Sequence, residues 1–196
     1  MEIRLSTPAA DTNLAALESL YLDAFPPEER RPWDAIVNPA EKGCPQLRAI
    51  YAGECLAGLV TTWTLGPVLY VEHLAVDPAM RGSGIGAAVM AALIADASPL
   101  ALLLEVEPES DDNPMAARRI GFYRRCGLDI LPYPYIQPPY APGLSSVPLL
   151  LMSSGSDVDP AEATRLLHTK VYGVYSPLPE HGAIKHPFPC SDVQQG

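Results

Sequence analysis

The sequence predicts a mixed α/β domain, because segments typical of strands alternate with segments typical of helices along most of the chain. The clearest case is residues 69–97, where an apolar, β-branched run is followed by Asp77-Pro78, a glycine-rich loop and the helix-forming run AAVMAALIADA. A second apolar run, from Leu100 to Glu107, is typical of a strand buried on both faces. A chain of 196 residues is long enough to enclose one sizeable core.

The residues before the central strand predict a strand, two helical segments and a hairpin. EIRLS, at residues 2–6, opens the sheet, and apolar residues at helical spacing in residues 14–24 predict a helix capped by Asp11 or Thr12. Residues 28–40 predict an irregular second helical stretch, and we interpret its charged run, residues 28–31, as a solvated face. Residues 46–51 and 56–64 predict the two strands of a hairpin.

The residues after the central helix predict a further strand, two helices and a final pair of strands. Asn113-Pro114 begins a helix that ends at Gly127. Residues 130–153 predict the strand pair, which is joined by the stiff, proline-rich loop PYPYIQPPYAPG. Residues 160–171 predict a short helix capped by Asp159. We therefore expect one domain over residues 1–172 and an extended or partly disordered Pro-rich tail over residues 173–196.

Charge and composition exclude several classes of protein. A net charge of −10 argues against nucleic acid as a direct partner, because phosphate contacts need a basic face. No apolar run approaches the length of a membrane span, and the N-terminus lacks the layout of a secretory signal. The four cysteines are scattered without a C-x-x-C pair, which predicts reduced thiols in the cytoplasm and neither a disulfide framework nor a metal site.

The loop at residues 81–86 predicts an anion-binding site. Glycines at the start of a helix let backbone N–H groups close on a phosphate or pyrophosphate. Gly82 to Ala87 fits the dinucleotide pattern G-x-G-x-x-A, with Glu105 about twenty residues further on. A dinucleotide loop leaves its strand directly, however, whereas residues 77–81 separate this strand from its first glycine.

Two sequence blocks carry a family resemblance. Val76-Asp77-Pro78 followed by Arg81-x-x-Gly84-x-Gly86 resembles the acyl-CoA signature of the GNAT N-acetyltransferase superfamily. Asn113-x-x-Ala116 and the run GFYRRCGL at residues 121–128 are similar to the family's second block, with Leu128 in place of the usual aromatic residue. The resemblance covers roughly residues 55–130. It implies a mostly antiparallel central sheet of about six or seven strands with helices on both faces, and acetyl-CoA as cosubstrate.

The resemblance also implies a set of donor-binding residues. The strand end would pair with the pantetheine amides, and the N–H groups of the loop would hold the pyrophosphate, with Arg81 adding positive charge. The residues concerned are Leu74, Ala75, Val76, Arg81, Gly82, Ser83, Gly84, Ile85 and Gly86. Asn113 either binds the cofactor or caps its own helix.

For catalysis, the resemblance implies an acid and a base. Tyr123 is the candidate acid, because a phenol of pKa about 10 can protonate a leaving thiolate; the alternative is a core aromatic residue. Glu72 and Glu105 are the candidate bases, with Glu72 placed slightly ahead of Glu105, acting directly or through water. We expect Glu72 to face the same side as Leu74, and His73 to point to the opposite face as a satisfied sheet histidine.

The predicted function is therefore acetyl transfer to an amine by direct attack in a ternary complex. Cys126 is the only cysteine in either block, so no acyl-enzyme is expected. Tyr133, Tyr135 and Tyr140 either form an aromatic wall at the acceptor site or pack against neighbouring prolines. The acceptor is open, small molecule or protein, and the chain is a monomer or a homodimer. Two alternatives remain at this point: an acyl-CoA-binding sensor without turnover and an NAD(P)-dependent oxidoreductase.

Overall fold

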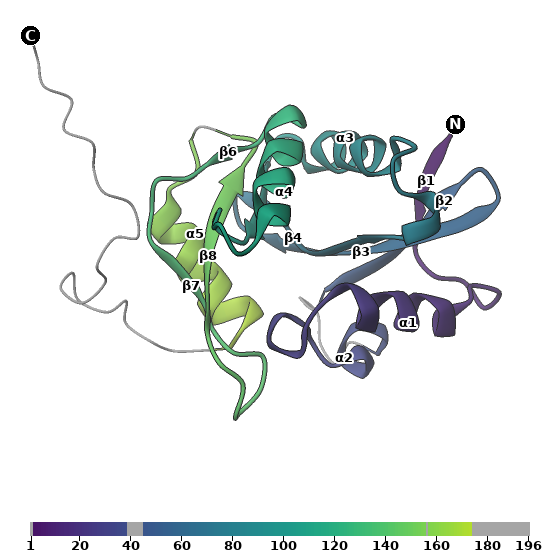
Figure 1. The fold of residues 1–196 in the computed structure, drawn as a ribbon, viewed down its shortest axis with the longest axis horizontal. Coiled ribbons are helices and arrows are strands. Elements are labelled where there is room, and N and C mark those ends of the chain that lie inside the picture. Colours follow the sequence, from purple (N-terminus) through teal and green to yellow (C-terminus); the bar gives the residue numbers. More distant parts are fainter. Residues whose placement is uncertain (1, 39–44, 156, 174–196) are drawn as a thin grey trace, which may run out of the picture.

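The computed structural model describes residues 2–38, 45–155 and 157–173, and within these it has one eight-stranded sheet (Figure 1). The sheet order is β1-β2-β3-β4-β5-β8-β6, and β7 pairs with β8. The strands are β1 (Ile3–Ser6), β2 (Gln46–Ala52), β3 (Cys55–Leu65), β4 (Val68–Val76), β5 (Ala101–Val106), β6 (Asp129–Ile130), β7 (Tyr135–Gln137) and β8 (Val147–Ser153). The helices are α1 (Leu14–Ala24), α2 (Trp33–Val37), α3 (Ile85–Ala97), α4 (Pro114–Arg125) and α5 (Pro160–Leu166), which a π-helical turn, η3 (Leu167–Val171), continues.

Helices cover both faces of this sheet. In Figure 1, α3 and α4 lie on one face, and α1 and α2 lie on the other. Apolar residues of β4 and β5, among them Leu69 and Leu104, pack with Val89 and Leu93 of α3. On the second face, Tyr70 and Leu103 pack with the C-terminal helix, which consists of α5 and η3, and Ala75 packs with α1. The expected α/β class with helices on both faces is confirmed, and the sheet has eight strands instead of six or seven, because β6 and β7 are short additional partners of β8.

The central strands β4 and β5 are parallel, and they pair over only four residues each. Val68–Val71 of β4 pairs with residues 101–104 of β5, and every other neighbouring pair in the sheet is antiparallel. Beyond Val71 and Leu104, the two strands continue without pairing with each other, while β4 stays paired with β3 and β5 with β8. The facing edges of Glu72–Val76 and of Glu105–Val106 therefore open a gap in the middle of the sheet.

A β-bulge lies at the point where this gap begins. Thr61 pairs with His73 and Thr62 with Val71, so Glu72 is an extra residue in β4. The bulge restarts the alternation of side chains, and Leu69, Val71, Leu74 and Val76 all contact the α3 side of the core. Glu72 and His73 consequently share the opposite face, with the His73 Nδ1 atom 3.7 Å from a Glu72 carboxylate oxygen.

This arrangement corrects two expectations from the sequence. Glu72 does not face the same side as Leu74, and His73 does not point away from Glu72. Strict alternation fails here because the bulge inserts one residue. His73 is nevertheless a satisfied sheet histidine, since its ring nitrogens lie within hydrogen-bond distance of the Tyr21 and Thr61 hydroxyls and the Glu29 carbonyl.

The predictions for the C-terminal part of the chain have different outcomes. The predicted helix over residues 160–171 is confirmed, with the Asp159 carboxylate accepting the Ala161 N–H. The proline-rich loop is non-helical as expected, but Tyr135–Gln137 within it pairs with β8. The predicted tail lies almost wholly outside the described residues. No helix among the described residues is long and apolar enough to span a membrane.

Candidate active site

The loop between β4 and α3 has the backbone geometry of an anion site. The Asp77 carboxylate accepts the Ala79 N–H and starts a short turn, and α3 then begins at Ile85 with Gly84 as its N-cap. Gly82 and Gly84 have φ angles of 79° and 84°, a left-handed conformation that glycine adopts without a Cβ penalty. A Cβ atom at either position would meet no atom within 4 Å, so the loop borders open space.

The polar groups of this loop are available to a ligand. The N–H groups of Gly82, Ser83 and Gly84 have no acceptor among the described residues, and all three residues are exposed. Arg81 donates its Nε hydrogen to the Val76 carbonyl at 3.1 Å, which holds the guanidinium at the end of β4. Unpaired N–H groups at a helix N-terminus beside a cation fit a diphosphate group.

The gap between β4 and β5 leads away from this loop. Leu74, Ala75 and Val76 pair with β3 on one edge, and their other edge has no strand partner among the described residues. A strand edge of this kind presents N–H and C=O groups that an extended chain with amide groups can pair with. The geometry therefore fits the pantetheine arm expected for the donor.

Tyr123 approaches the core from the α3 side of the sheet. It lies on α4, partly buried against the core, and burial raises the pKa of its phenol. Its hydroxyl has no hydrogen-bond partner among the described residues. Asn113 caps the same helix, with its side-chain oxygen accepting the Ala116 N–H at 3.3 Å, so its capping role is confirmed.

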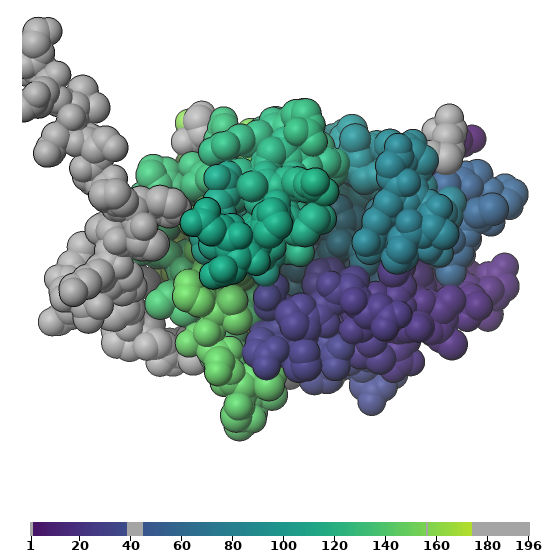
Figure 2. All heavy atoms as spheres, viewed as in Figure 1, coloured from purple at the N-terminus to yellow at the C-terminus, as the bar shows by residue number. Residues whose placement is uncertain are grey.

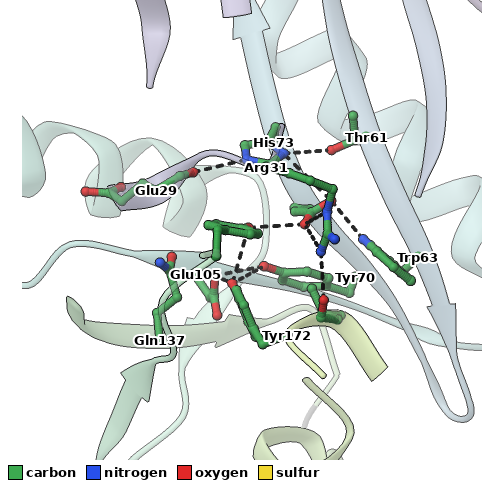
Figure 3. A network of polar contacts seen from close by, with 12 residues as sticks. Glu29, Arg31, Thr61, Trp63, Tyr70, His73, Glu105, Gln137 and Tyr172 are labelled. Carbon is green, nitrogen blue, oxygen red and sulfur yellow. Dashed lines mark hydrogen bonds and ion pairs between the residues drawn. The ribbon is translucent and has the colours of Figure 1, made fainter. Parts of the chain in front are cut away.

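Glu72 is held in a buried ion pair with Arg31 on the other face of the sheet; Figure 3 labels its partners Arg31 and Trp63. Its Oε1 atom accepts hydrogen bonds from Nε and Nη2 of Arg31 at 3.0 and 2.9 Å, and from the Tyr140 hydroxyl at 3.1 Å. The Trp63 indole N–H donates to Oε2 at 2.8 Å. The Glu72 side chain is 0% exposed, and the Arg31 guanidinium also lies over the Trp63 and Tyr140 rings.

Glu105 is surrounded by tyrosine hydroxyls. Tyr70 and Tyr172 each donate to its Oε2 atom at 2.8 Å (Figure 3). Tyr135 donates to Oε1. Burial raises the pKa of Glu105 to about 7, and the three hydroxyl donors oppose that rise. Glu105 therefore differs from Glu72 in having hydroxyl donors in place of a cation.

The two carboxylates belong to one network. The Tyr140 hydroxyl, bonded to Glu72, lies 3.4 Å from the Tyr172 hydroxyl, which is bonded to Glu105. Burial first, and the nearby carboxylates next, hold the pKa of Tyr140 and Tyr172 well above the usual value, so both remain hydrogen-bond donors. Burial lowers the pKa of His73, which keeps that neighbouring ring neutral.

The structure thus brings Glu72 and Glu105 together with Tyr135 and Tyr140, but not with Tyr133. The interpretation of residues 28–31 as a solvated face was wrong for Arg31, whose side chain is 16% exposed and bonded to Glu72. The sequence reasoning also missed Trp63, Tyr70 and Tyr172. Only Tyr70 carried a usable signal, because it precedes Glu72 by two residues on the same strand.

A surface groove of about 420 Å³ borders this network at Arg31 and Tyr140. Arg31 and Tyr140 belong to both, and the groove runs between α1, the segment around residues 27–34 and the segment at residues 140–144. Figure 2 shows the green residues of the last segment lying against the purple N-terminal residues. The carboxylates of Glu18 and Asp34, which also line the groove, form no ion pair among the described residues. Within the same residues, no group of three or more potential ligands could hold a metal ion.

Comparisons with known proteins agree with this geometry. The acetyltransferase (GNAT) family model matches residues 14–128. A putative GNAT-family acetyltransferase structure from Bacteroides thetaiotaomicron is 30% identical, with a TM-score of 0.76 over 89% of this chain and 99% of that one. A Bacillus subtilis acetyltransferase in complex with CoA is 17% identical, with a TM-score of 0.51 over 77% and 95%.

A third similar structure, an IAA acetyltransferase from Bacillus cereus, is 15% identical, with a TM-score of 0.51 over 78% and 97% of the two chains. The comparison with curated proteins found no match. The family model spans more than half of the chain and contains both the glycine loop and Tyr123. This chain therefore belongs to the GNAT family of acetyltransferases.

Proposed function

We propose that this acetyltransferase moves the acetyl group of acetyl-CoA to a primary amine by direct attack in a ternary complex. One observation carries the proposal. The gap between β4 and β5 has the glycine loop at its outer end, Tyr123 on one side of the sheet and the two carboxylates on the other. A thioester lying in the gap would have a proton donor and a proton acceptor on opposite sides.

For donor binding, we assign the diphosphate to the N–H groups of residues 82–86 with Arg81, and the pantetheine amides to the free edge at Leu74, Ala75 and Val76. Asn113 remains a proposed donor contact beside its capping role. When bound, the donor supplies an acyl group activated as a thioester. The chain's own residues orient the donor and carry out the proton transfers.

For catalysis, we assign Glu105 as the base and Tyr123 as the acid. The amine nitrogen attacks the thioester carbonyl carbon, the carbon–sulfur bond breaks, and Glu105 takes the proton that the nitrogen loses. The Tyr123 hydroxyl gives its proton to the leaving sulfur and regains one from solvent. Glu105 suits the role because a base with pKa about 7 is partly ionised at neutral pH and still basic enough to accept a proton. Glu72 is bound to Arg31, and we propose that this ion pair keeps the charge next to Glu105 constant.

For the acceptor, we propose a small amine that enters through the groove that borders the network. The groove volume of about 420 Å³ lies within the range of small-molecule sites, roughly 300–1,000 Å³. Two groove carboxylates, Glu18 and Asp34, form no ion pair among the described residues. Of the two groove arginines, Arg31 is paired with Glu72 and only Arg30 lacks an ion pair within those residues, so the balance favours an acceptor that carries positive charge. The wall contributed by Tyr140 is an aromatic surface on which such a cation can pack.

The donor assignment is tested by thermal shift. We expect acetyl-CoA at about 100 times its Kd to stabilise the chain by about 2.7 kcal/mol, or roughly 5–10 °C, and NAD to give no shift. Gly84→Glu is expected to lose the shift, because a carboxylate there repels the diphosphate. Gly53→Glu is the matched control, since Gly53 also has a left-handed φ, 59°, and open space at its Cβ position, but lies in the β2–β3 turn. An undiminished shift in Gly84→Glu would remove the diphosphate assignment.

The activity itself is tested with a panel of amines of different size and charge, following free CoA release and the mass of the acceptor. We expect at least one cationic amine to gain a single acetyl group. Binding of acetyl-CoA without turnover of any amine would favour the sensor alternative instead.

A further inference from the structure

We propose that Tyr172 is a positioning residue for Glu105, so that the C-terminal segment completes the active site of this enzyme. The inference rests on the proposed role of Glu105 as base. Tyr172 lies well beyond the family-matched segment, which ends at residue 128. Its contribution therefore comes from a part of the chain outside the two sequence blocks that identify the family.

The contacts of Tyr172 join the two carboxylates. Its hydroxyl donates to Glu105 at 2.8 Å and lies 3.4 Å from each of the Tyr70 and Tyr140 hydroxyls. Tyr140 in turn donates to Glu72. Because a hydroxyl has one hydrogen to donate, and Tyr70, Tyr140 and Tyr172 each donate theirs to a carboxylate, the two 3.4 Å separations are contacts between hydroxyl oxygens.

The position of this hydroxyl is fixed by the end of the C-terminal helix. The Tyr172 N–H donates to the Leu167 carbonyl, and Leu167 and Val171 are buried against the sheet. The Val171 carbonyl accepts a hydrogen bond from Arg31 at 2.7 Å. Two consecutive residues thus contact the two halves of the network: Val171 contacts the Arg31–Glu72 pair, and Tyr172 contacts Glu105.

The surroundings of Glu105 define what Tyr172 does to its charge. The titratable groups that face it are the hydroxyls of Tyr70, Tyr135, Tyr140 and Tyr172 and the carboxylate of Glu72, whose own partners are Arg31 and the neutral His73. A hydroxyl that donates to a carboxylate stabilises the ionised form. Tyr172 therefore keeps Glu105 ionised enough to act as a base, and holds its oxygen in place.

The experiment is a titration of carboxyl-labelled glutamate by NMR in the full chain, which requires no acceptor. The Glu105 resonance is assigned by its loss in Glu105→Gln. In Tyr172→Phe, which retains the ring that packs against Tyr140, we expect its midpoint to move to higher pH by about half to one unit, because one of three donors is lost. Tyr133→Phe is the matched control, because the Tyr133 hydroxyl has no partner among the described residues. A Tyr172→Phe midpoint equal to that of the wild type would overturn the proposal.

Kinetics then separate this inference from the proposed function. With any amine that turns over, we expect Tyr172→Phe to lower kcat about tenfold with the KM for acetyl-CoA unchanged, and to move the acid limb of the pH–rate profile upward. If Glu105→Gln retains that limb, Glu105 is not the base, whatever the NMR titration shows. If Glu105→Gln abolishes the limb but Tyr172→Phe does not move it, the positioning role alone fails.

A measurement on the unmodified chain covers the case in which Tyr172→Phe does not fold. In tyrosine-labelled protein, the Tyr172 hydroxyl proton is expected to exchange slowly with water because it is bonded to Glu105. Rapid exchange of this proton would contradict the contact on which the proposal is based.

Discussion

The buried ion pair between Glu72 and Arg31 gives the most demanding stability prediction. Glu72→Gln keeps the size of the side chain but removes its charge. The amide oxygen can still accept from Arg31, whereas the amide NH₂ group faces the Trp63 indole N–H, which needs an acceptor at 2.8 Å. Arg31 remains 16% exposed, without the carboxylate that balanced its charge.

The expected magnitude follows from these contacts. Removing one partner of a buried pair costs roughly 3–5 kcal/mol, because the other charge stays buried and unpaired. We expect about 3 kcal/mol here, the lower end, since Arg31 keeps its bond to the Val171 carbonyl and its contact with the Trp63 ring. For a chain of this size, such a loss lowers Tm by roughly 6–12 °C.

The assay is urea denaturation at neutral pH, with Asp96→Asn as the matched control. Asp96 also pairs with an arginine, Arg48, but its side chain is 53% exposed, so its loss should change the free energy of unfolding by less than about 1 kcal/mol. The double variant Glu72→Gln/Arg31→Met should recover part of the loss, because it leaves no unpaired charge. Equal small effects of Glu72→Gln and Asp96→Asn would refute the reasoning.

Two further predictions concern the proposed base and acid. The pKa of Glu105 is raised from its ordinary value, 4.5, to about 7 in the folded state, so this group stabilises the fold fully below about pH 4.5 and the contribution is lost as pH rises through 7. Relative to Glu105→Gln, the wild type should therefore lose roughly 3 kcal/mol of unfolding free energy between about pH 4.5 and pH 8; a constant difference across this range would contradict the raised pKa. For Tyr123→Phe, we expect kcat to fall about a hundredfold while the Kd for acetyl-CoA, measured by titration calorimetry, stays unchanged; full retained activity would exclude Tyr123 as the acid.

Parts of the fold and of the site depend on short stretches of sequence, and those parts were predictable. The strand, turn and glycine loop at residues 68–86 lie within a few residues of one another. Their local conformations are therefore determined by nearby proline, glycine and helix-capping residues. The same holds for Asn113, whose capping bond spans three residues. Because these features are local, the sequence alone and the family model identify the same donor.

The acceptor side depends on distant residues instead. Arg31 meets Glu72 across 41 positions, and Tyr172 meets Glu105 across 67. No local pattern predicts these contacts, because they form only when the sheet, the segment at residues 27–31 and the C-terminal helix pack together. A charged run at residues 28–31 and a tyrosine at the end of a helix look like surface residues until that packing is known.

The sequence by itself determined the α/β class, the glycine loop and the acetyl-CoA chemistry expected of it. Only the tertiary structure decided which face the carboxylates share and which of them is paired with a cation. The physical reason is the single extra residue in β4. A bulge at Glu72 changes the face of a side chain without changing the composition of the strand, and it becomes visible only when the register of β3 against β4 is known.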